Sequence, residues 1–240
     1  MSPRPPRQSD ASFVAFPTLK DAGEALARDA SGWLRTALEK QGLASIAVPG
    51  GSSPAPFFRT LAAADLDWSA MRVTLTDERF VPENSDESNS KLLRRTFLQG
   101  RAAEAQFTMP ALSNTTLERA ALEWDSQIRA APAFDLVVLG MGEDGHFASL
   151  FPGSPALADG LDIYADRYAI AAPDRTPQRL SLTLRALVRT QLMVFLIGGA
   201  AKRGLVESAL WNKPSAEGLP ISSLLRQSPI KPVFYWGAFS

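Results

Sequence analysis

Four short apolar segments, each ending at a glycine or a polar turn, constrain the fold of this chain most strongly. They cover residues 44–48, 72–75, 134–139 and 192–197, and residues 168–172 and 233–236 are two weaker examples. Short apolar runs with such endings indicate strands that are buried on both faces, as in parallel sheets. We therefore expect a largely parallel sheet at the centre of the fold.

Helical patterns separate these strands, at residues 21–39, 54–64, 88–98, 116–129 and 200–211. Gly42 is expected to end the first helix, and Asn114 or Thr115 to cap the fourth. Alternating strands and helices predict an α/β fold whose sheet is flanked by helices. No repeat or linker divides the chain, so we expect one domain over residues 11–240. Residues 1–10 are expected to form a disordered tail, with a transit peptide as the alternative.

Composition excludes several classes of function. The 25 basic residues balance the 25 acidic ones, so the chain has no general attraction for nucleic acid or anionic membranes. No apolar run approaches the roughly 20 residues of a membrane span. The chain lacks cysteine, which excludes disulfides and thiolate metal sites and fits a reducing compartment.

Polar and glycine-rich segments follow the strands, where ligands bind in open α/β sheets. After the first strand come Gly50, Gly51 and Ser52, and then a helix. Glycine lets the backbone approach an anion closely, serines can cap the helix, and the start of a helix favours anions. The segment is interpreted as a phosphate site or as a plain capped turn.

The second expected strand, residues 72–75, is followed by the polar segment Thr76-Asp77-Glu78-Arg79. Arg79 can hold a phosphate or polarise a carbonyl, and Asp77 can orient hydroxyl groups of a sugar. A surface ion pair is the alternative interpretation of these charges.

The third strand leads into a segment that holds the only histidine of the chain, His146, with Asp144 two residues earlier. Histidine titrates near neutrality and suits a general base, and Asp144 can orient it, although a lone histidine is often structural. Gly140, Gly142 and Gly145 also fit a G-x-G-x-x-G pattern. Pro152 interrupts the helix that a dinucleotide site would need, so we reject nicotinamide binding.

Two further cations lie beside expected strands. Arg179 precedes an alternating segment in which Leu180, Leu182 and Leu184 form one buried face. Lys202 falls in the first turn of a helix, where it opposes the helix dipole unless an anion is bound. An exposed lysine is the alternative at that position.

Taken in order, these segments resemble the 6-phosphogluconolactonase family. The matching stretches are VPGGSSP (48–54), TDERFVP with SN (76–82 and 88–89), GMGEDGHFASLFPG (140–153), PQRLSLTL (177–184) and GGAAK (198–202). The resemblance implies a Rossmann-like three-layer fold of the sugar-phosphate isomerase type, without cofactor or metal. It implies hydrolysis of 6-phospho-D-glucono-1,5-lactone in the pentose phosphate pathway. The segment APDRT before Arg179 and the C-terminus VFYWGAFS depart from the family pattern.

The resemblance also implies roles for individual residues. His146 is expected to act as general base on water with support from Asp144, and Asp77 and Arg79 to contact the reacting end of the substrate. The residues expected around the phosphate are Gly50, Gly51, Ser52, Arg179 and Lys202. Backbone N–H groups of the glycine-rich turn or Arg79 are expected to stabilise the oxyanion.

Two other functions remain open on the sequence. An amino-sugar-phosphate deaminase or isomerase would share the phosphate site, but the resemblance to it fails at 149–153, which lacks the glutamate of that family's Asn-Glu-Pro-Gly segment. A non-catalytic sugar-phosphate sensor would need a DNA-binding module, for which the residues before the first motif are too few. We expect a cytoplasmic monomer or weak homodimer whose partner is a small molecule, with no nucleic acid or membrane bound.

Overall fold

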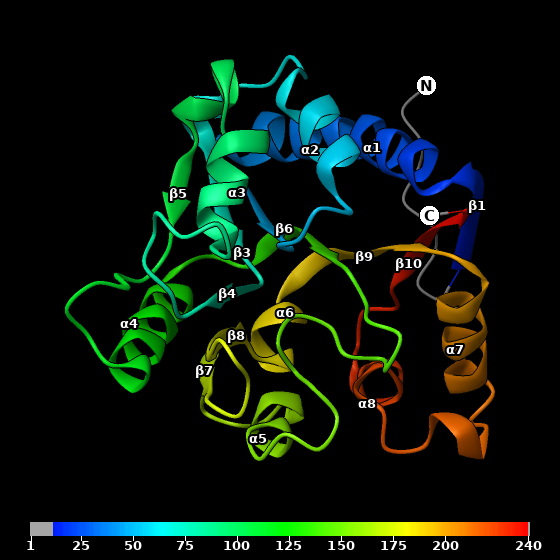
Figure 1. The fold of residues 1–240 in the computed structure, drawn as a ribbon. Helices are drawn as coiled ribbons and strands as arrows, with labels where there is room; N and C mark the ends of the chain where they lie inside the picture. The colour runs from blue at the N-terminus through cyan, green and yellow to red at the C-terminus, as the bar shows by residue number, and fades with distance from the viewer. Residues whose placement is uncertain (1–11, 240) are drawn as a thin grey trace.

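The computed structural model describes residues 12–239 and contains a seven-stranded sheet at its centre (Figure 1). The strand order is β1-β10-β9-β6-β2-β3-β5, and all six neighbouring pairs are parallel. The bounds are β1 Ser12–Thr18, β2 Ala44–Val48, β3 Met71–Leu75, β5 Gln106–Thr108, β6 Phe134–Leu139, β9 Thr190–Gly198 and β10 Val233–Phe239. The predicted α/β fold with a largely parallel sheet is confirmed. The tail predicted for residues 1–10 lies outside the described residues.

Helices cover both faces of this sheet and make the fold three-layered. In Figure 1, α1 and α2 lie on one side of the sheet, and α7 and α8 lie on the other. The helix bounds are α1 Leu19–Gln41, α2 Ala55–Ala62, α3 Asn89–Thr96, α4 Leu117–Ala130, α5 Leu157–Leu161, α6 Leu184–Leu187, α7 Ala200–Leu210 and α8 Pro220–Gln227. No helix within residues 12–239 is long and apolar enough to cross a membrane.

The direction in which the chain adds strands reverses between β2 and β6. From β2 the chain moves outward to β3 and β5, and it then returns past β2 to build β6, β9 and β10 on the other side. The loops that leave β2 and β6 therefore diverge at the carboxyl edge of the sheet. Such a switch point leaves a crevice for a ligand.

A second, antiparallel sheet of three strands differs from the prediction. It has the order β4-β8-β7, with bounds Asp77–Arg79, Arg179–Leu182 and Ala169–Ala172. Residues 168–172, predicted as a strand, thus belong to this small sheet. Leu180, Leu182 and Leu184 are all buried as expected, but Leu184 begins α6 instead of extending the strand, because Thr183 caps that helix with its side chain.

One predicted helix end is confirmed, and the predicted caps of two other helices are wrong. Gly42 ends α1 in the left-handed conformation at φ 69°, as predicted. The side chain that caps α4 is Thr116, rather than Asn114 or Thr115, and it accepts the N–H of Arg119. Neither Ser52 nor Ser53 caps α2, whose N-cap is Pro54.

Candidate functional site

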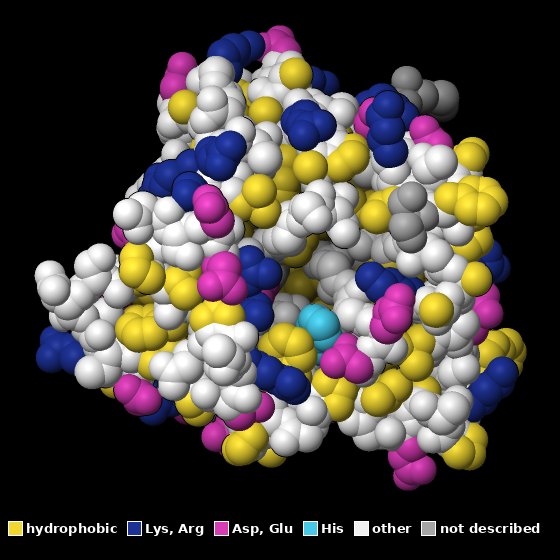
Figure 2. Space-filling model, viewed as in Figure 1, with side chains coloured by type: hydrophobic (Ala, Val, Ile, Leu, Met, Phe, Trp, Pro, Cys, Tyr) yellow, Lys and Arg dark blue, Asp and Glu magenta, His cyan; other side chains and the backbone are white. Residues whose placement is uncertain are grey.

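A cavity of about 210 Å³ lies at the carboxyl ends of four adjacent strands, β9, β6, β2 and β3. Its lining includes seven of the predicted site residues, namely Gly50, Gly51, Asp77, Arg79, His146, Arg179 and Lys202. Figure 2 shows the histidine at the edge of a hollow in this face, with lysine and arginine side chains on both sides of it. The described structure thus brings together groups that lie up to 152 residues apart in the sequence, from Gly50 to Lys202.

The histidine is oriented by the carboxylate that the sequence suggested. Nδ1 of His146 lies 2.5 Å from Oδ1 of Asp144, which also accepts the backbone N–H of His146 at 3.2 Å. Burial by itself would raise the pKa of the Asp144 carboxyl, but its hydrogen bonds with His146 outweigh burial and hold that pKa below its usual range. With Nδ1 as the protonated nitrogen, Nε2 carries a lone pair and can accept a proton.

Close packing fixes the imidazole ring in place. A Cβ atom on Gly142 would lie 2.2 Å from two atoms of the ring, so this position requires glycine. The ring of Phe151 packs against the imidazole with centroids 4.3 Å apart. Ala148, which also lines the cavity, has the uncommon φ of 48°. Such backbone strain persists only where the surroundings hold it, and it is frequent at functional sites.

Asp77 is held at the cavity by hydroxyl groups. Its Oδ2 accepts the hydroxyl of Ser149 at 2.8 Å, and Oδ1 accepts that of Thr76 at 3.3 Å. Ser149 is 1% exposed and comes from the same loop as His146, so the loop after β6 meets β4 at this carboxylate. Asp77 has no ion pair within residues 12–239, which argues against the surface ion pair considered above.

Three cations face the cavity without a carboxylate partner among the described residues. Arg79 and Arg179 are direct cross-strand partners on β4 and β8, and Lys202 lies in the first turn of α7. Burial, together with the positive charge of Arg79 beside it, lowers the pKa of Arg179. Like charges directly opposite each other destabilise a sheet. A bound anion would remove this repulsion, so the arrangement is suited to bind one.

The turn after β2 offers backbone donors to such an anion. The N–H groups of Gly50 and Gly51 make no hydrogen bond with the residues that the structure describes, and both glycines line the cavity. Ser52 is exposed and lies outside the lining, where Ser53 takes its place. In the turn after β6, by contrast, the N–H of Gly142 already donates to the carbonyl of His146, so it is not free for an oxyanion.

Sequence reasoning assigned no role to several residues of the lining. Asn89 was noticed only as part of a motif, yet its amide contacts both Arg79 and the backbone of Asp77. Phe151 also lines the cavity and lies in the third motif without a predicted role. Ser149, in the same motif, lies outside the lining but donates its hydroxyl to Asp77. The only signal in the sequence was that these three residues lie in stretches that resemble the family, because their side chains carry no obvious chemistry.

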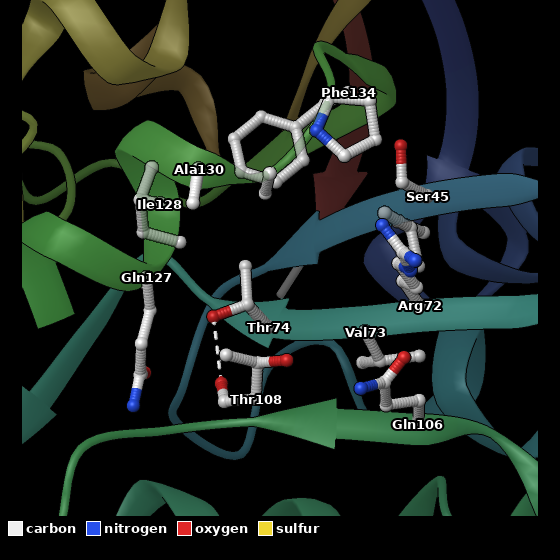
Figure 3. Close-up of a pocket in the computed structure, with 13 residues that line it drawn as sticks. Ser45, Arg72, Val73, Thr74, Gln106, Thr108, Gln127, Ile128, Ala130 and Phe134 are labelled. Atoms are coloured by element: carbon white, nitrogen blue, oxygen red, sulfur yellow. Dashed lines mark hydrogen bonds between the residues drawn. The ribbon is translucent and has the colours of Figure 1, made fainter.

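A larger cavity, of about 300 Å³, lies elsewhere, near the amino ends of β2, β3 and β6 and against the last turn of α4 (Figure 3). Its polar groups include Arg72, Gln106 and Gln127, and the hydroxyl of Thr74 donates to the carbonyl of Thr108. This cavity contains no carboxylate and no histidine. It therefore lacks the acid–base groups that the cavity around His146 combines.

The residues that the structure describes contain no group of three or more histidine, cysteine, aspartate or glutamate side chains placed to hold a metal ion.

Comparison with known proteins identifies the family of this chain. Residues 17–233 match the family described as glucosamine-6-phosphate isomerases/6-phosphogluconolactonase. The chain is 40% identical to a 6-phosphogluconolactonase of Caulobacter vibrioides over 92% of its own length and 95% of that relative. It is 40% identical to one of Rhizobium meliloti, covering 94% and 98% of the two chains. A crystal structure of a 6-phosphogluconolactonase from Shewanella baltica superposes with a TM-score of 0.86 at 32% identity, covering 96% and 99%.

Proposed function

Because the chain belongs to the glucosamine-6-phosphate isomerase/6-phosphogluconolactonase family, we propose that it hydrolyses 6-phospho-D-glucono-1,5-lactone to 6-phosphogluconate, a step of the pentose phosphate pathway. One observation carries the proposal. The imidazole of His146, with Nδ1 bound to Asp144, lies in the same cavity as three cations that have no carboxylate partner among residues 12–239. A base that faces an anion site suits a substrate that carries a phosphate at one end and an ester at the other.

In the proposed mechanism, Nε2 of His146 removes a proton from water, and the water oxygen attacks the lactone carbonyl carbon. The resulting imidazolium is stabilised by the Asp144 carboxylate at Nδ1. It then protonates the ring oxygen as the bond between that oxygen and the carbonyl carbon breaks, which leaves the acid product and neutral histidine. No group other than His146 needs to transfer a proton.

The cations divide the remaining tasks. Arg79 is the proposed donor to the oxyanion, since it is near Asp77 and the N–H of Gly142 is already used. Arg179, Lys202 and the free N–H groups of Gly50 and Gly51 are proposed to bind the phosphate. Ser52 is not proposed as a phosphate ligand, because it lies outside the cavity. Phosphate binding would hold the ring near the base, so remote binding energy assists the reaction.

The direct test compares two substrates. Purified protein should accelerate the loss of 6-phosphogluconolactone above its spontaneous rate, and it should release no ammonia from glucosamine 6-phosphate. Ammonia release would support the deaminase alternative. Binding of 6-phosphogluconate without turnover of the lactone would support the sensor alternative.

We also propose a cytoplasmic location, because a phosphorylated substrate is charged and does not cross a bilayer unaided. A monomeric or weakly dimeric state stays a prediction, which light scattering over a range of protein concentrations would test.

A further inference from the structure

Glu78 is a buried carboxylate for which the proposed reaction has no use. It follows Asp77 on β4, is 0% exposed, and does not line the cavity. Within the described residues it forms no ion pair. Its oxygens instead accept backbone N–H groups of Arg79 at 2.6 Å and of Asn89 and Ser90 at 2.7 Å each. A buried charge is tolerated only when its hydrogen bonds are satisfied.

The contacts of Glu78 fix the start of α3 against β4. Asn89 and Ser90 are the first two residues of α3, where N–H groups have no partner within the helix and attract negative charge. The helix cap Ser88 also donates its hydroxyl to Glu78, at 3.3 Å. Burial raises the pKa of the Glu78 carboxyl. The N–H groups act in the opposite direction, because they favour its ionised form, but burial outweighs them. This network therefore fixes the position of Asn89 relative to β4.

Asn89 uses that position to hold the cavity side of β4. Its Oδ1 accepts Nη1 of Arg79 at 2.6 Å, and its Nδ2 donates to the carbonyl of Asp77 at 2.9 Å. The side chain is 1% exposed and fills the space above Gly50, where a Cβ atom would lie 2.1 Å from the amide carbon. One amide therefore joins the turn after β2, Asp77 and Arg79.

The neutrality of this amide matters for Arg79. Apart from Asn89, the only partner that Arg79 Nη1 has in the described structure is the carbonyl of Glu87, at 2.9 Å. Both acceptors are uncharged, so they orient the guanidinium without neutralising it. An aspartate at position 89 would keep the acceptor but would pair with Arg79 and compete with an anionic substrate.

We infer that Asn89, fixed by the buried Glu78, is a positioning residue that orients Arg79 toward the phosphorylated substrate while leaving its charge available. The inference rests on the proposed function for the identity of the substrate. It assigns Asn89 an effect, through Arg79, on the binding of the substrate and of the oxyanion rather than on proton transfer.

The test uses the full chain and the variants Asn89→Ala and Asn89→Asp. KM and kcat are measured with 6-phosphogluconolactone, and Kd is measured with 6-phosphogluconate by calorimetry. Asn89→Ala should raise both KM and Kd roughly tenfold, as expected for a lost hydrogen bond to a charged group. Because Arg79 is also the proposed donor to the oxyanion, kcat should fall as well. Asn89→Asp, which has the same shape, should raise KM and Kd further because of its charge. Glu78→Gln should also raise KM, because Glu78 fixes the position of Asn89.

Thr116→Ala is the matched control, because it removes a comparable side-chain cap from α4, whose Thr116 does not line the cavity. It should lower the melting temperature and leave KM and Kd unchanged. A merely structural role of Asn89 would reduce the active fraction, so kcat would fall while KM and Kd stayed at wild-type values. That result, or an Asn89→Asp variant that binds 6-phosphogluconate as tightly as wild type, would overturn the inference. Absence of lactone turnover by the wild type would instead contradict the proposed function, and the Kd comparison would still test Asn89.

Discussion

At the residue scale, the cavity separates the proposed base from the cations that are proposed to bind an anion. His146 and Asp144 come from one loop, and their hydrogen bond of 2.5 Å sets which ring nitrogen is free. Arg79 and Arg179 come from adjacent antiparallel strands whose register places two cations side by side. Because the two groups lie on different elements, substitutions can be expected to affect turnover and binding separately.

Replacing Asp144 with Asn tests the orientation of the imidazole. The Asp144 carboxylate and a protonated His146 stabilise each other, which is why hydrogen bonding with His146 lowers the pKa of Asp144 despite burial. Without the negative charge the protonated ring loses this stabilisation. We expect kcat to fall on the order of tenfold or more, because the imidazolium formed during catalysis is less stable. Steady-state kinetics with 6-phosphogluconolactone measure this fall, and a kcat at the wild-type level would contradict the role of Asp144.

Replacing Arg179 with Ala tests the anion site. Arg179 is half-buried beside Arg79, and its pKa is lowered by burial and by that neighbouring charge. We expect the Kd for 6-phosphogluconate to rise about tenfold or more, since a charge-assisted hydrogen bond is lost. Dephosphorylated gluconate provides the control ligand, and its weak binding should not change. Equal losses for both ligands would show that Arg179 does not recognise the phosphate.

At the element scale, the loop after β6 supplies the proposed base, His146, and its glycines decide how closely the loop can fold. Gly145 has φ 77°, which disfavours other residues. Gly142 is required for a different reason, since its missing side chain leaves room for the imidazole. Its N–H donates to the carbonyl of His146 at 2.9 Å and closes the loop upon itself.

Gly142→Ala should therefore displace the His146 ring, because the new Cβ would lie 2.2 Å from Nδ1 and 2.6 Å from Oδ1 of Asp144. We expect kcat to fall by roughly 10²-fold or more, the size of a lost general base, with a smaller change in KM. Gly204→Ala in α7 is the matched control, since nothing lies within 4 Å of its Cβ and alanine favours helices. Full activity of Gly142→Ala would show that the ring position is not critical.

Sequence patterns predicted the strands whose burial is uniform. They missed short or polar elements, and they also missed β1, whose seven residues are only partly buried. The strands β2, β3, β6 and β9 were found because apolar runs end at turns, and their ends located the site. The three-residue strand β4, Asp77–Arg79, has no apolar alternation, so it was taken for part of a loop. The alternating pattern of residues 180–184 predicts a strand that is too long, because the pattern does not reveal that Thr183 caps a helix.

Individual site residues were predictable where their chemistry is visible in the residue type. His146, Arg79 and Arg179 were found in this way. The contacts that hold them were not predictable, because Ser149 and Asn89 meet Asp77 and Arg79 only through the packing of separate loops. Ser52 and Ser53 are both plausible from sequence, and only the direction of the turn distinguishes them.

At the scale of the whole molecule, the first and last strands close the sheet at one edge. β1 pairs with β10 in parallel, and Tyr235 of β10 donates its hydroxyl to Asp29 of α1 at 2.5 Å. Tyr235 is 4% exposed. Burial, and then the hydrogen bond to Asp29, raise the pKa of this tyrosine. The contact joins segments 206 residues apart and lies outside the cavity.

Tyr235→Phe should lower the free energy of unfolding by about 1–2 kcal/mol at neutral pH, the usual effect of one buried hydrogen bond. The folded-state pKa of Tyr235 is raised above the ordinary value of about 10. Its stabilisation is therefore fully present below about pH 10 and is lost as the pH rises further, because the unfolded chain then releases the proton first. Urea unfolding at pH 7 and above pH 10 should show the difference between wild type and variant shrinking. A difference that grows with pH would contradict this linkage.

In the proposed mechanism His146 transfers protons while other residues bind the substrate. The decisive experiment is the steady-state kinetics of His146→Ala with 6-phosphogluconolactone, corrected for the spontaneous rate. We expect kcat to fall by about 10²- to 10⁴-fold, the contribution typical of a general base, with KM within a few-fold of wild type. Turnover near the wild-type level, or a variant that loses its affinity while kcat is preserved, would contradict the assignment of His146 as the base.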